Sequence, residues 1–273
     1  MDATGPAACR LTDVSVSHGD TGILFDVTID FPRNACTVIM GPSGSGKTTL
    51  LKTAAGLLMP DRGRIEILGI DPWTASDRAV DSLRARNGFV FQDDGLWQNL
   101  SLYQNLALPL QYHRLEPDAA AVRRRVERVA GELGATHRLD LRPSQVSEGE
   151  RKIVSFVRAI VNDPELLFMD EPSTSVDADR IDRVIRRLKD LRERRTTIVA
   201  VTHDARIASQ IADYVAVMMQ GRLLTFGSLR EVSRSDDPQV QRILTDVLSE
   251  TASYDGDILD LLGPDVRATT DET

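Results

Sequence analysis

Short apolar runs recur along the chain and alternate with stretches that have helical spacing. Runs that are apolar throughout are typical of strands buried on both faces of a sheet, and they occur at 37–40, 64–68, 89–91, 166–169 and 197–202. From Tyr214 the pattern predicts a hairpin that turns at Gln220 and Gly221. Strands alternating with helices predict an α/β fold with a mixed, largely parallel sheet.

Residues 76–160 interrupt this alternation. Within 118–135 the apolar residues fall at helical spacing, at Val122, Val126, Val129, Ala130 and Leu133. We therefore expect one domain over 1–232, with a mainly helical insert at about 76–160 and an appended segment at 233–273.

Four arginines lie on the predicted helix of the insert, at positions 123, 124, 125 and 128. Residues 233–273 contain ten acidic and three basic side chains, and the whole chain has 41 and 33, so the first 232 residues hold 31 acids and 30 bases. Because that part has no basic excess, we interpret the arginines as a solvated helix face and expect no nucleic-acid partner.

The acidic extension, 233–273, also carries two apolar groups. One consists of Ile243, Leu244, Val247 and Leu248, and the other of Ile258, Leu259, Leu261 and Leu262. The pattern leaves open whether these groups pack on their own chain or on a second copy.

The chain has no segment that predicts a secretory leader or a membrane span. The first residues lack a basic start and an apolar core, and no run approaches the ~18–20 apolar residues of a transmembrane helix. Cys9 and Cys36 make no disulfide framework, so we expect reduced, inert packing residues. We expect the protein to reach a membrane only through a partner.

A phosphate-binding loop is the strongest motif. GPSGSGKTT fits G-x-x-x-x-G-K-[ST] between a predicted strand and a predicted helix. Glycines let backbone N–H groups turn toward phosphate, Lys47 reaches the β- and γ-phosphates, and the Thr48 hydroxyl ligates Mg²⁺. The motif predicts a nucleoside triphosphate site in this phosphate loop, which consists of Gly41, Pro42, Ser43, Gly44, Ser45, Gly46, Lys47, Thr48 and Thr49.

Polar side chains that follow other predicted strands complete a candidate catalytic site. Asp170 ends an apolar run and is a candidate Mg²⁺ ligand, and Glu171 is positioned to polarise an attacking water. His203 and Gln92 each follow another strand, and ligands of open α/β sheets bind at such strand ends. We expect Gln92 to contact Mg²⁺ or the attacking water.

In this order, GPSGSGKTT, Gln92, VSEGE (146–150), LLFMDEP, SVD (175–177) and His203 resemble the ATPase subunits of ABC transporters. The resemblance covers roughly residues 10–230 and implies ATP and Mg²⁺ as cofactors, held between two copies of the chain. It also implies that the turn at 146–150, here called the signature turn, closes over the partner copy's nucleotide. Ser147 and Gly149 would supply those contacts, Asp177 would couple the two sites, and His18 would contact adenine.

The signature turn departs from the family's usual LSGGQ, because Glu148 replaces a Gly and Glu150 replaces a Gln. A carboxylate ~8 Å from a phosphate charge costs about 2 kcal/mol at an effective dielectric of 20. We expect the adjacent Arg151 and Lys152 to offset this repulsion, unless Glu148 points outward.

The segment FQDDGLWQNLSLYQNLALPLQYH (91–113) resembles the ATPases of MCE-type bacterial phospholipid systems. The resemblance implies a peripheral protein at the cytoplasmic face of the inner membrane, which contacts permease subunits through about 92–112. The apolar contacts there would be Trp97, Leu100, Leu102 and Tyr103, unless these pack the insert's own core. The alternatives are ATPases for lipoprotein release or amino-acid transport and a soluble assembly scaffold. A DNA-associated ABC ATPase is disfavoured because the chain has no long coiled-coil insert.

Overall fold

The structure is a computed structural model that describes residues 6–136 and 138–249. Strands in these residues form a three-stranded antiparallel sheet, in the order β2-β1-β4, and a six-stranded sheet, in the order β5-β6-β7-β3-β8-β9. The strands are β1 Ala7–His18, β2 Thr21–Pro32, β3 Cys36–Met40, β4 Arg62–Ile67, β5 Asn87–Val90, β6 Leu166–Asp170, β7 Thr197–Val201, β8 Tyr214–Met219 and β9 Arg222–Ser228.

The six-stranded sheet has the mixed, largely parallel arrangement that the sequence predicts. Its first five strands pair in parallel, and β9 returns antiparallel to β8. Every residue of β3, β6 and β7 is buried, which explains why these strands are apolar throughout. The hairpin turns where predicted, with left-handed backbone at Gln220 and Gly221.

The sequence pattern did not predict β1 and β2, the first two strands of the three-stranded sheet. The β1–β2 pairing shifts register at several points, and Asp13 and Asp26 both have a φ of 51°. Such irregularities interrupt the alternation of inward and outward side chains by which a strand is recognised.

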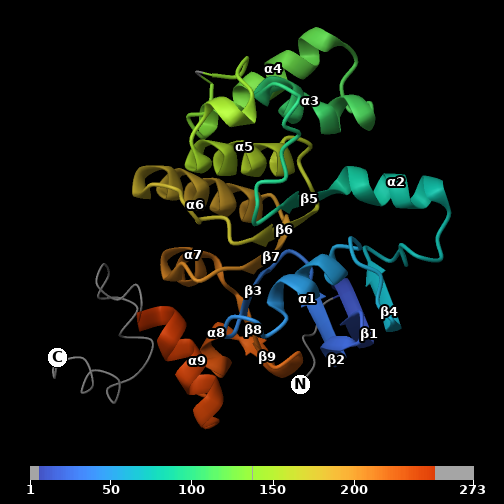
Figure 1. Ribbon diagram of the computed structural model, residues 1–273, viewed down its shortest axis with the longest axis vertical. Helices are drawn as coiled ribbons and strands as arrows, with labels where there is room; N and C mark the ends of the chain where they lie inside the picture. Colours follow the sequence, from blue (N-terminus) through green and yellow to red (C-terminus); the bar gives the residue numbers. More distant parts are fainter. Residues whose placement is uncertain (1–5, 137, 250–273) are drawn as a thin grey trace.

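Three of the helices gather at one end of the molecule. In Figure 1, α3, α4 and α5 lie at one end and the sheet of β1, β2 and β4 lies at the other, with the six-stranded sheet between them. Although β5 falls within the range 76–160, it belongs to the six-stranded sheet. The helices are α1 Lys47–Ala54, α2 Asp77–Arg86, α3 Leu102–Tyr112, α4 Ala119–Glu132, η1 Pro143–Gln145, α5 Glu148–Ile160, α6 Ala178–Glu193, α7 Ala205–Ile211, α8 Leu229–Val232 and α9 Pro238–Ser249.

The α4 helix buries the predicted apolar positions and exposes arginines. Val126 and Val129 are fully buried in a core that α4 shares with the six-stranded sheet. Arg123 and Arg128 form ion pairs four residues along the helix, with Glu127 at 3.2 Å and Glu132 at 3.3 Å. These two arginines are thus paired with acids of their own helix. Arg125 departs from the predicted solvated face, because it is partly buried and pairs with Glu116 at 3.3 Å and Asp163 at 2.8 Å, outside the helix.

The α9 helix packs on the chain's own body. Val240, Ile243 and Leu244 are buried in the same core as β3. Ile243 and Leu244 therefore pack on their own chain rather than on a second copy. The structure describes the backbone of Val247 and Leu248 but not their side chains, and the apolar group at 258–262 lies outside the described residues. No helix in the described ranges is both long and apolar enough to cross a membrane.

Both cysteines are free and buried. The Cys9 thiol donates to the carbonyl of Ala54 at 3.3 Å. Burial raises the pKa of both thiols, which disfavours the reactive thiolate.

Candidate functional site

The phosphate loop connects β3 to α1 at the carboxyl edge of the six-stranded sheet. Gly44 and Gly46 have left-handed backbone, with φ of 76° and 96°. A Cβ added at Gly46 would lie 2.9 Å from Leu24 Cδ2 and 3.2 Å from the Ile23 carbonyl oxygen. The loop therefore requires glycine at position 46 for both its conformation and its close approach to β2.

The β8–β9 turn supports the loop from behind. Gly221 N donates to the Ser45 carbonyl at 3.0 Å, and Phe25 N donates to the Gly221 carbonyl at 2.9 Å. The loop is thus hydrogen-bonded to a turn more than 170 residues away in the sequence.

Lys47 is the first residue of α1, and its side chain folds back across the loop. Its Nζ donates to the carbonyls of Gly41 and Pro42 at 2.7 and 2.9 Å. Burial lowers the pKa of Lys47, and the nearby carboxylates of Glu171 and Asp170 oppose that shift. This holds the Lys47 ammonium against two carbonyls of the phosphate loop.

Asp170, at the end of β6, faces the phosphate loop. Its Oδ1 accepts a hydrogen bond from the Thr48 hydroxyl at 3.0 Å. Burial raises the pKa of Asp170, and the Thr48 hydrogen bond opposes this. Its Oδ2 and the hydroxyl of Ser45 are buried without a hydrogen-bond partner among the described residues.

Glu171 follows the end of β6 and His203 follows the end of β7, its neighbour in the sheet, and their side chains meet there. Glu171 has left-handed backbone, with a φ of 48°, and its Oε2 accepts from His203 N at 3.2 Å. His203 Nε2 lies 3.3 Å from Glu171 Oε1. Burial raises the pKa of Glu171 to about 7, and the hydrogen bond from His203 N opposes this shift. A carboxyl with a pKa near neutrality is suited to accept a proton from water.

A cavity of about 270 Å³ brings most predicted site residues together. Gly41, Pro42, Ser45 and Asp170 do not line it, and neither do Ser147, Gly149, Asp177 and His18. His18 is exposed at the end of β1, opposite Thr21. The lining residues are Ile23, Ser43, Gly44, Gly46, Lys47, Thr48, Thr49, Gln92, Glu171, Val201 and His203.

Lys152 positions the Gln92 side of this cavity, a role that the sequence did not reveal. Its Nζ donates to the carbonyls of Phe91 and Gln92 at 3.0 and 2.6 Å, and its side chain is 2% exposed. Burial lowers its pKa. The sequence did contain a signal for this role, because Lys152 falls within the strongly apolar face of a helix. A lysine buried there requires hydrogen-bond acceptors.

The signature turn is built as a helix N-terminus. Ser147 caps α5 and forms a capping box with Glu150: Glu150 N donates to Ser147 Oγ at 3.2 Å, and Ser147 N donates to Glu150 Oε2 at 3.0 Å. Glu148 Oε1 accepts from the Ser175 hydroxyl at 2.9 Å. A Cβ at Gly149 would collide with the Ser175 carbonyl oxygen, so this glycine allows the turn to pack on the segment before Asp177.

The structure shows which groups engage the two cations next to the turn. The charge of Glu148 acts on Lys152, but both cations also have other partners. Arg151 pairs with Asp94 at 2.8 Å, and Lys152 is bound to the loop of Gln92. The ion pairs of Glu150 are formed by Arg138 at 3.8 Å and Arg180 at 3.9 Å. These arginines come from other elements, so adjacency in sequence did not indicate them.

Comparisons with known families and sequences identify relatives of the chain. Residues 24–174 match the family model described as ABC transporter. The chain is 35% identical over 255 residues to the sulfate/thiosulfate import ATP-binding protein CysA of Yersinia pseudotuberculosis, covering 91% of this chain and 67% of that protein. It is 37% identical over 227 residues to the molybdate/tungstate import ATP-binding protein WtpC of Archaeoglobus fulgidus, covering 81% and 89%.

Among solved structures, the fold is similar to a dimeric post-hydrolysis state of the ATP-binding cassette MJ0796 bound to ADP and Pi. The TM-score is 0.75 at 27% identity, and the match covers 81% of this chain and 98% of that one.

Fold and site define an ATP-binding cassette, an ATPase of the phosphate-loop class. The chain belongs to the ABC transporter family and is one of its ATP-binding subunits. Its cofactors are ATP and Mg²⁺.

The residues present fit these groups. The unpartnered Asp170 Oδ2 and the Thr48 hydroxyl are hard oxygen ligands, and Mg²⁺ typically takes only one or two carboxylates together with phosphate oxygens and water. No cluster of three His, Cys, Asp or Glu residues suited to a metal occurs within the described part of the chain. The phosphate loop and Lys47 supply the donors that a triphosphate requires.

Proposed function

We propose that two copies of this chain enclose two MgATP molecules and that ATP binding and hydrolysis drive a membrane permease. The observation that supports this most directly is the separation of the predicted contacts. Lys47, Glu171 and His203 share one cavity, whereas Ser147 and Gly149 do not line it. A second copy would supply the signature turn and complete the site.

Within the site, each residue has a proposed role. The phosphate loop and Lys47 bind the triphosphate, while Thr48, Asp170 and Gln92 hold Mg²⁺. Glu171 orients and deprotonates the attacking water, and His203, in contact with its carboxylate, fixes its geometry. Asp177 couples the two sites, and His18 contacts adenine.

Replacing Glu171 by Gln tests this arrangement. Glu171→Gln is expected to retain ATP binding, lose at least about 100-fold in turnover, and accumulate a dimer in MgATP. Hydrolysis and sedimentation velocity measure these outcomes. Glu231→Gln, which changes an exposed carboxyl on α8, is the matched control. Near wild-type turnover by Glu171→Gln would exclude the role of Glu171, and a fully active monomer would exclude the shared site.

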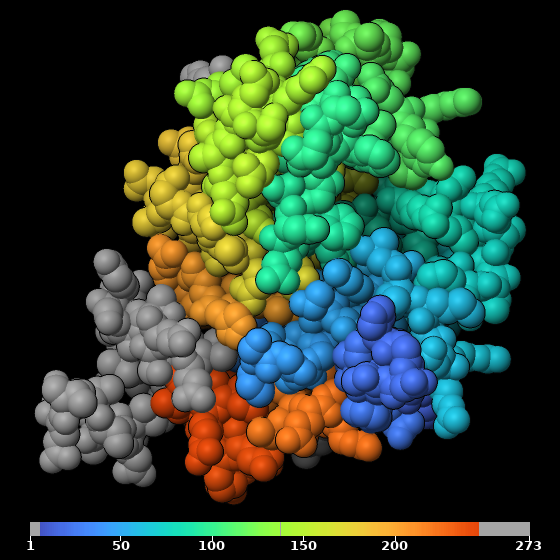
Figure 2. Space-filling view, viewed as in Figure 1, coloured from blue at the N-terminus to red at the C-terminus, as the bar shows by residue number. Residues whose placement is uncertain are grey.

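We propose that residues 92–112 contact the permease, through a different set of side chains from the one predicted. Trp97 is 59% exposed and Tyr112 is 65% exposed, so these side chains are available to a partner. Leu102 is buried in the insert's own core, and Tyr103 is partly buried beside Arg123. In Figure 2 the segment that follows β5, drawn in sea green, runs down the visible face toward the blue N-terminal region.

Asn105 fixes the shape of this surface. It is fully buried, its Oδ1 accepts from Trp97 N at 2.8 Å, and its Nδ2 donates to the carbonyls of Trp97 and Ser101 at 3.1 and 3.0 Å. A buried amide with three partners holds the 97–101 loop in one conformation. This supports a preformed docking surface around Trp97.

We propose phospholipid as the cargo, as in MCE-type systems, on the resemblance of residues 91–113. The domain would comprise 1–232, with the helical insert at about 76–160 and the acidic extension at 233–273. It would lie at the cytoplasmic face of the inner membrane. The names of the relatives favour a second candidate, an importer of sulfate- or molybdate-like oxyanions.

Purification of the complete complex distinguishes the two candidates. The full chain is purified with its membrane subunits in detergent and reconstituted, and ATPase activity is measured with added phospholipid or with sulfate or molybdate plus the cognate binding protein. Stimulation by phospholipid alone supports the lipid cargo. Stimulation by an oxyanion alone replaces it with the import of oxyanions.

A further inference from the structure

Glu150 occupies an unusual position, because one carboxylate engages a predicted ATP contact and two arginines at once. Its Oε2 accepts hydrogen bonds from Ser147 N at 3.0 Å and from the Ser147 hydroxyl at 3.1 Å. The hydroxyl proton therefore points into its own protomer. The hydrogen bond from Ser147 N is the main reason that the pKa of Glu150 is lowered, so the carboxylate is charged near neutral pH.

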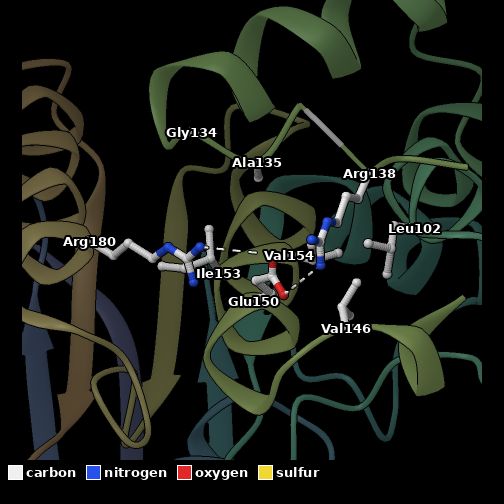
Figure 3. A pocket seen from close by; sticks show the side chains of 9 residues that line it. All are labelled: Leu102, Gly134, Ala135, Arg138, Val146, Glu150, Ile153, Val154 and Arg180. Carbon is white, nitrogen blue, oxygen red and sulfur yellow. Dashed lines mark ion pairs between the residues drawn. The ribbon is translucent and has the colours of Figure 1, made fainter. Parts of the chain in front are cut away.

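Arg138 and Arg180 hold this carboxylate from opposite sides, as Figure 3 shows. Arg180 also pairs with Asp177, the N-cap of α6, at 3.4 Å. The network thus joins the signature turn to the segment after α4 and to the start of α6. Together with the bond between Ser175 and Glu148, it makes the turn one unit with residues 175–180.

A cavity of about 280 Å³ lies beside Glu150, with Leu102, Val146, Ile153 and Val154 among its lining residues. Only 26% of the Glu150 side chain is exposed, but the cavity leaves space on one side of it. The carboxylate can therefore rotate away from Ser147 without displacing the helix.

We propose that Glu150 is a positioning residue that retains the Ser147 hydroxyl until the γ-phosphate of ATP on the partner copy takes it. This inference rests on the proposed ATP-dependent dimer. Donation to a carboxylate is a charge-assisted hydrogen bond, roughly twice as strong as donation to a neutral amide. The phosphate must replace this bond at both sites of the dimer, so Glu150 weakens closure.

Glu150→Gln tests the proposal, because glutamine preserves the capping box and removes the charge, and with it the ion pairs to Arg138 and Arg180. In the Glu171→Gln background with saturating MgATP, we expect it to lower the dimer dissociation constant by about tenfold or more, given two hydroxyls per dimer. Sedimentation equilibrium of the full chain measures this constant. With Glu171 present, Glu150→Gln is expected to lower KM for MgATP and to leave kcat within about twofold.

The chain contains a matched control. Glu231 forms the same capping box with Ser228, in which the Ser228 hydroxyl donates to Glu231 Oε2 at 2.8 Å. Glu231→Gln removes the same kind of charge at α8, outside the proposed interface, and is expected to leave the dissociation constant and KM unchanged. A merely structural effect of losing a capping carboxylate would appear in both variants.

The outcomes separate this inference from the proposed function. If Glu171→Gln forms no dimer in MgATP, the proposed function fails. If it forms a dimer whose dissociation constant is unchanged or higher with Glu150→Gln, the dimer stands and the role of Glu150 is wrong. ATP binding to the dilute monomer is measured by the fluorescence of a labelled nucleotide. Its affinity is expected to be the same with and without Glu150→Gln. A change there would assign the effect to the phosphate loop and would overturn the proposal.

Discussion

Glu171 is a buried acid whose ionisation opposes folding. Its pKa rises from 4.5 to about 7 on folding, mainly because of burial. The folded protein holds this proton more tightly than the unfolded chain. The resulting stability is therefore full below about pH 4.5 and is lost as pH rises through about 7.

We therefore expect Glu171→Gln to stabilise the nucleotide-free protein at high pH. The gain in unfolding free energy is near zero at low pH and rises toward about 3 kcal/mol above pH 8, since one pKa unit corresponds to about 1.4 kcal/mol. Urea denaturation at pH 5 and pH 8.5 measures it. Glu231→Gln is the control, because hydrogen bonds from Ser228 lower the pKa of that exposed carboxyl and no gain is expected. A gain that is equal at both pH values would contradict the raised pKa.

Arg187 on α6 is a buried cation with one acidic partner. Its Nη1 lies 3.3 Å from Glu132 Oε2, and its Nε and Nη2 have no hydrogen-bond partner among the described residues. Glu132→Gln would leave this guanidinium buried without the countercharge that pairs with it among the described residues. We expect a loss of about 2 kcal/mol in unfolding free energy, reduced from the usual cost because Glu132 is 35% exposed.

Thermal and urea denaturation check this expectation against Glu127→Gln. Glu127 pairs with Arg123 on the same helix, but both side chains are about half exposed, so its loss is expected to cost under about 1 kcal/mol. Arg187→Met removes the buried charge altogether and is expected to be less destabilising than Glu132→Gln. The reverse order would show that the ion pair at Glu132 is not what stabilises Arg187.

At the scale of elements, α5 joins the loop of Gln92 to the signature turn. Arg151 pairs with Asp94, Lys152 bonds the Gln92 carbonyl, and Arg158 donates to the Gly95 carbonyl at 2.7 Å. The same helix begins at the signature turn. A displacement of residues 91–95 by a docked partner would therefore act directly on the signature turn.

Lys152→Met tests this connection. It leaves two buried carbonyls without a donor, and we expect turnover to fall about tenfold as Gln92 loses its position, with a loss of about 2 kcal/mol in stability. Lys189→Met is the control, since the exposed Lys189 hydrogen-bonds the Gln210 side chain on the surface. Steady-state ATPase assays and urea denaturation measure both. Unchanged turnover in Lys152→Met would remove Lys152 from the positioning of Gln92.

The sequence predicted those elements whose local pattern is regular. The phosphate loop, the buried strands and the α4 stripe each follow from a motif or a period, and the structure has them at the predicted places. Strands β1 and β2 were missed because left-handed residues at Asp13 and Asp26 break their period. The partners of Glu150 were missed because Arg138 and Arg180 meet it only in the fold. Contacts between distant segments are not encoded in local spacing.

For the whole molecule, the test is whether the exposed side chain of Trp97 connects the ATPase to a membrane partner. Trp97 extends from a loop that the buried Asn105 holds through backbone atoms, so Trp97→Ala keeps those hydrogen bonds. We expect Trp97→Ala to retain thermal stability and to lose most of its co-purification with membrane subunits, because large aromatic anchors dominate binding energy at interfaces.

Trp73→Ala supplies the comparison, since Trp73 is also exposed, at 39%, but precedes α2 outside the proposed contact. Quantitative recovery of permease from detergent extracts measures both variants. Equal recovery with Trp97→Ala and wild type would move the docking surface away from 92–112. Equal losses with both tryptophan variants would indicate a general effect of surface aromatics. If only Trp97→Ala loses permease recovery, with its stability intact, the partner docks on the 97–101 loop that Asn105 holds.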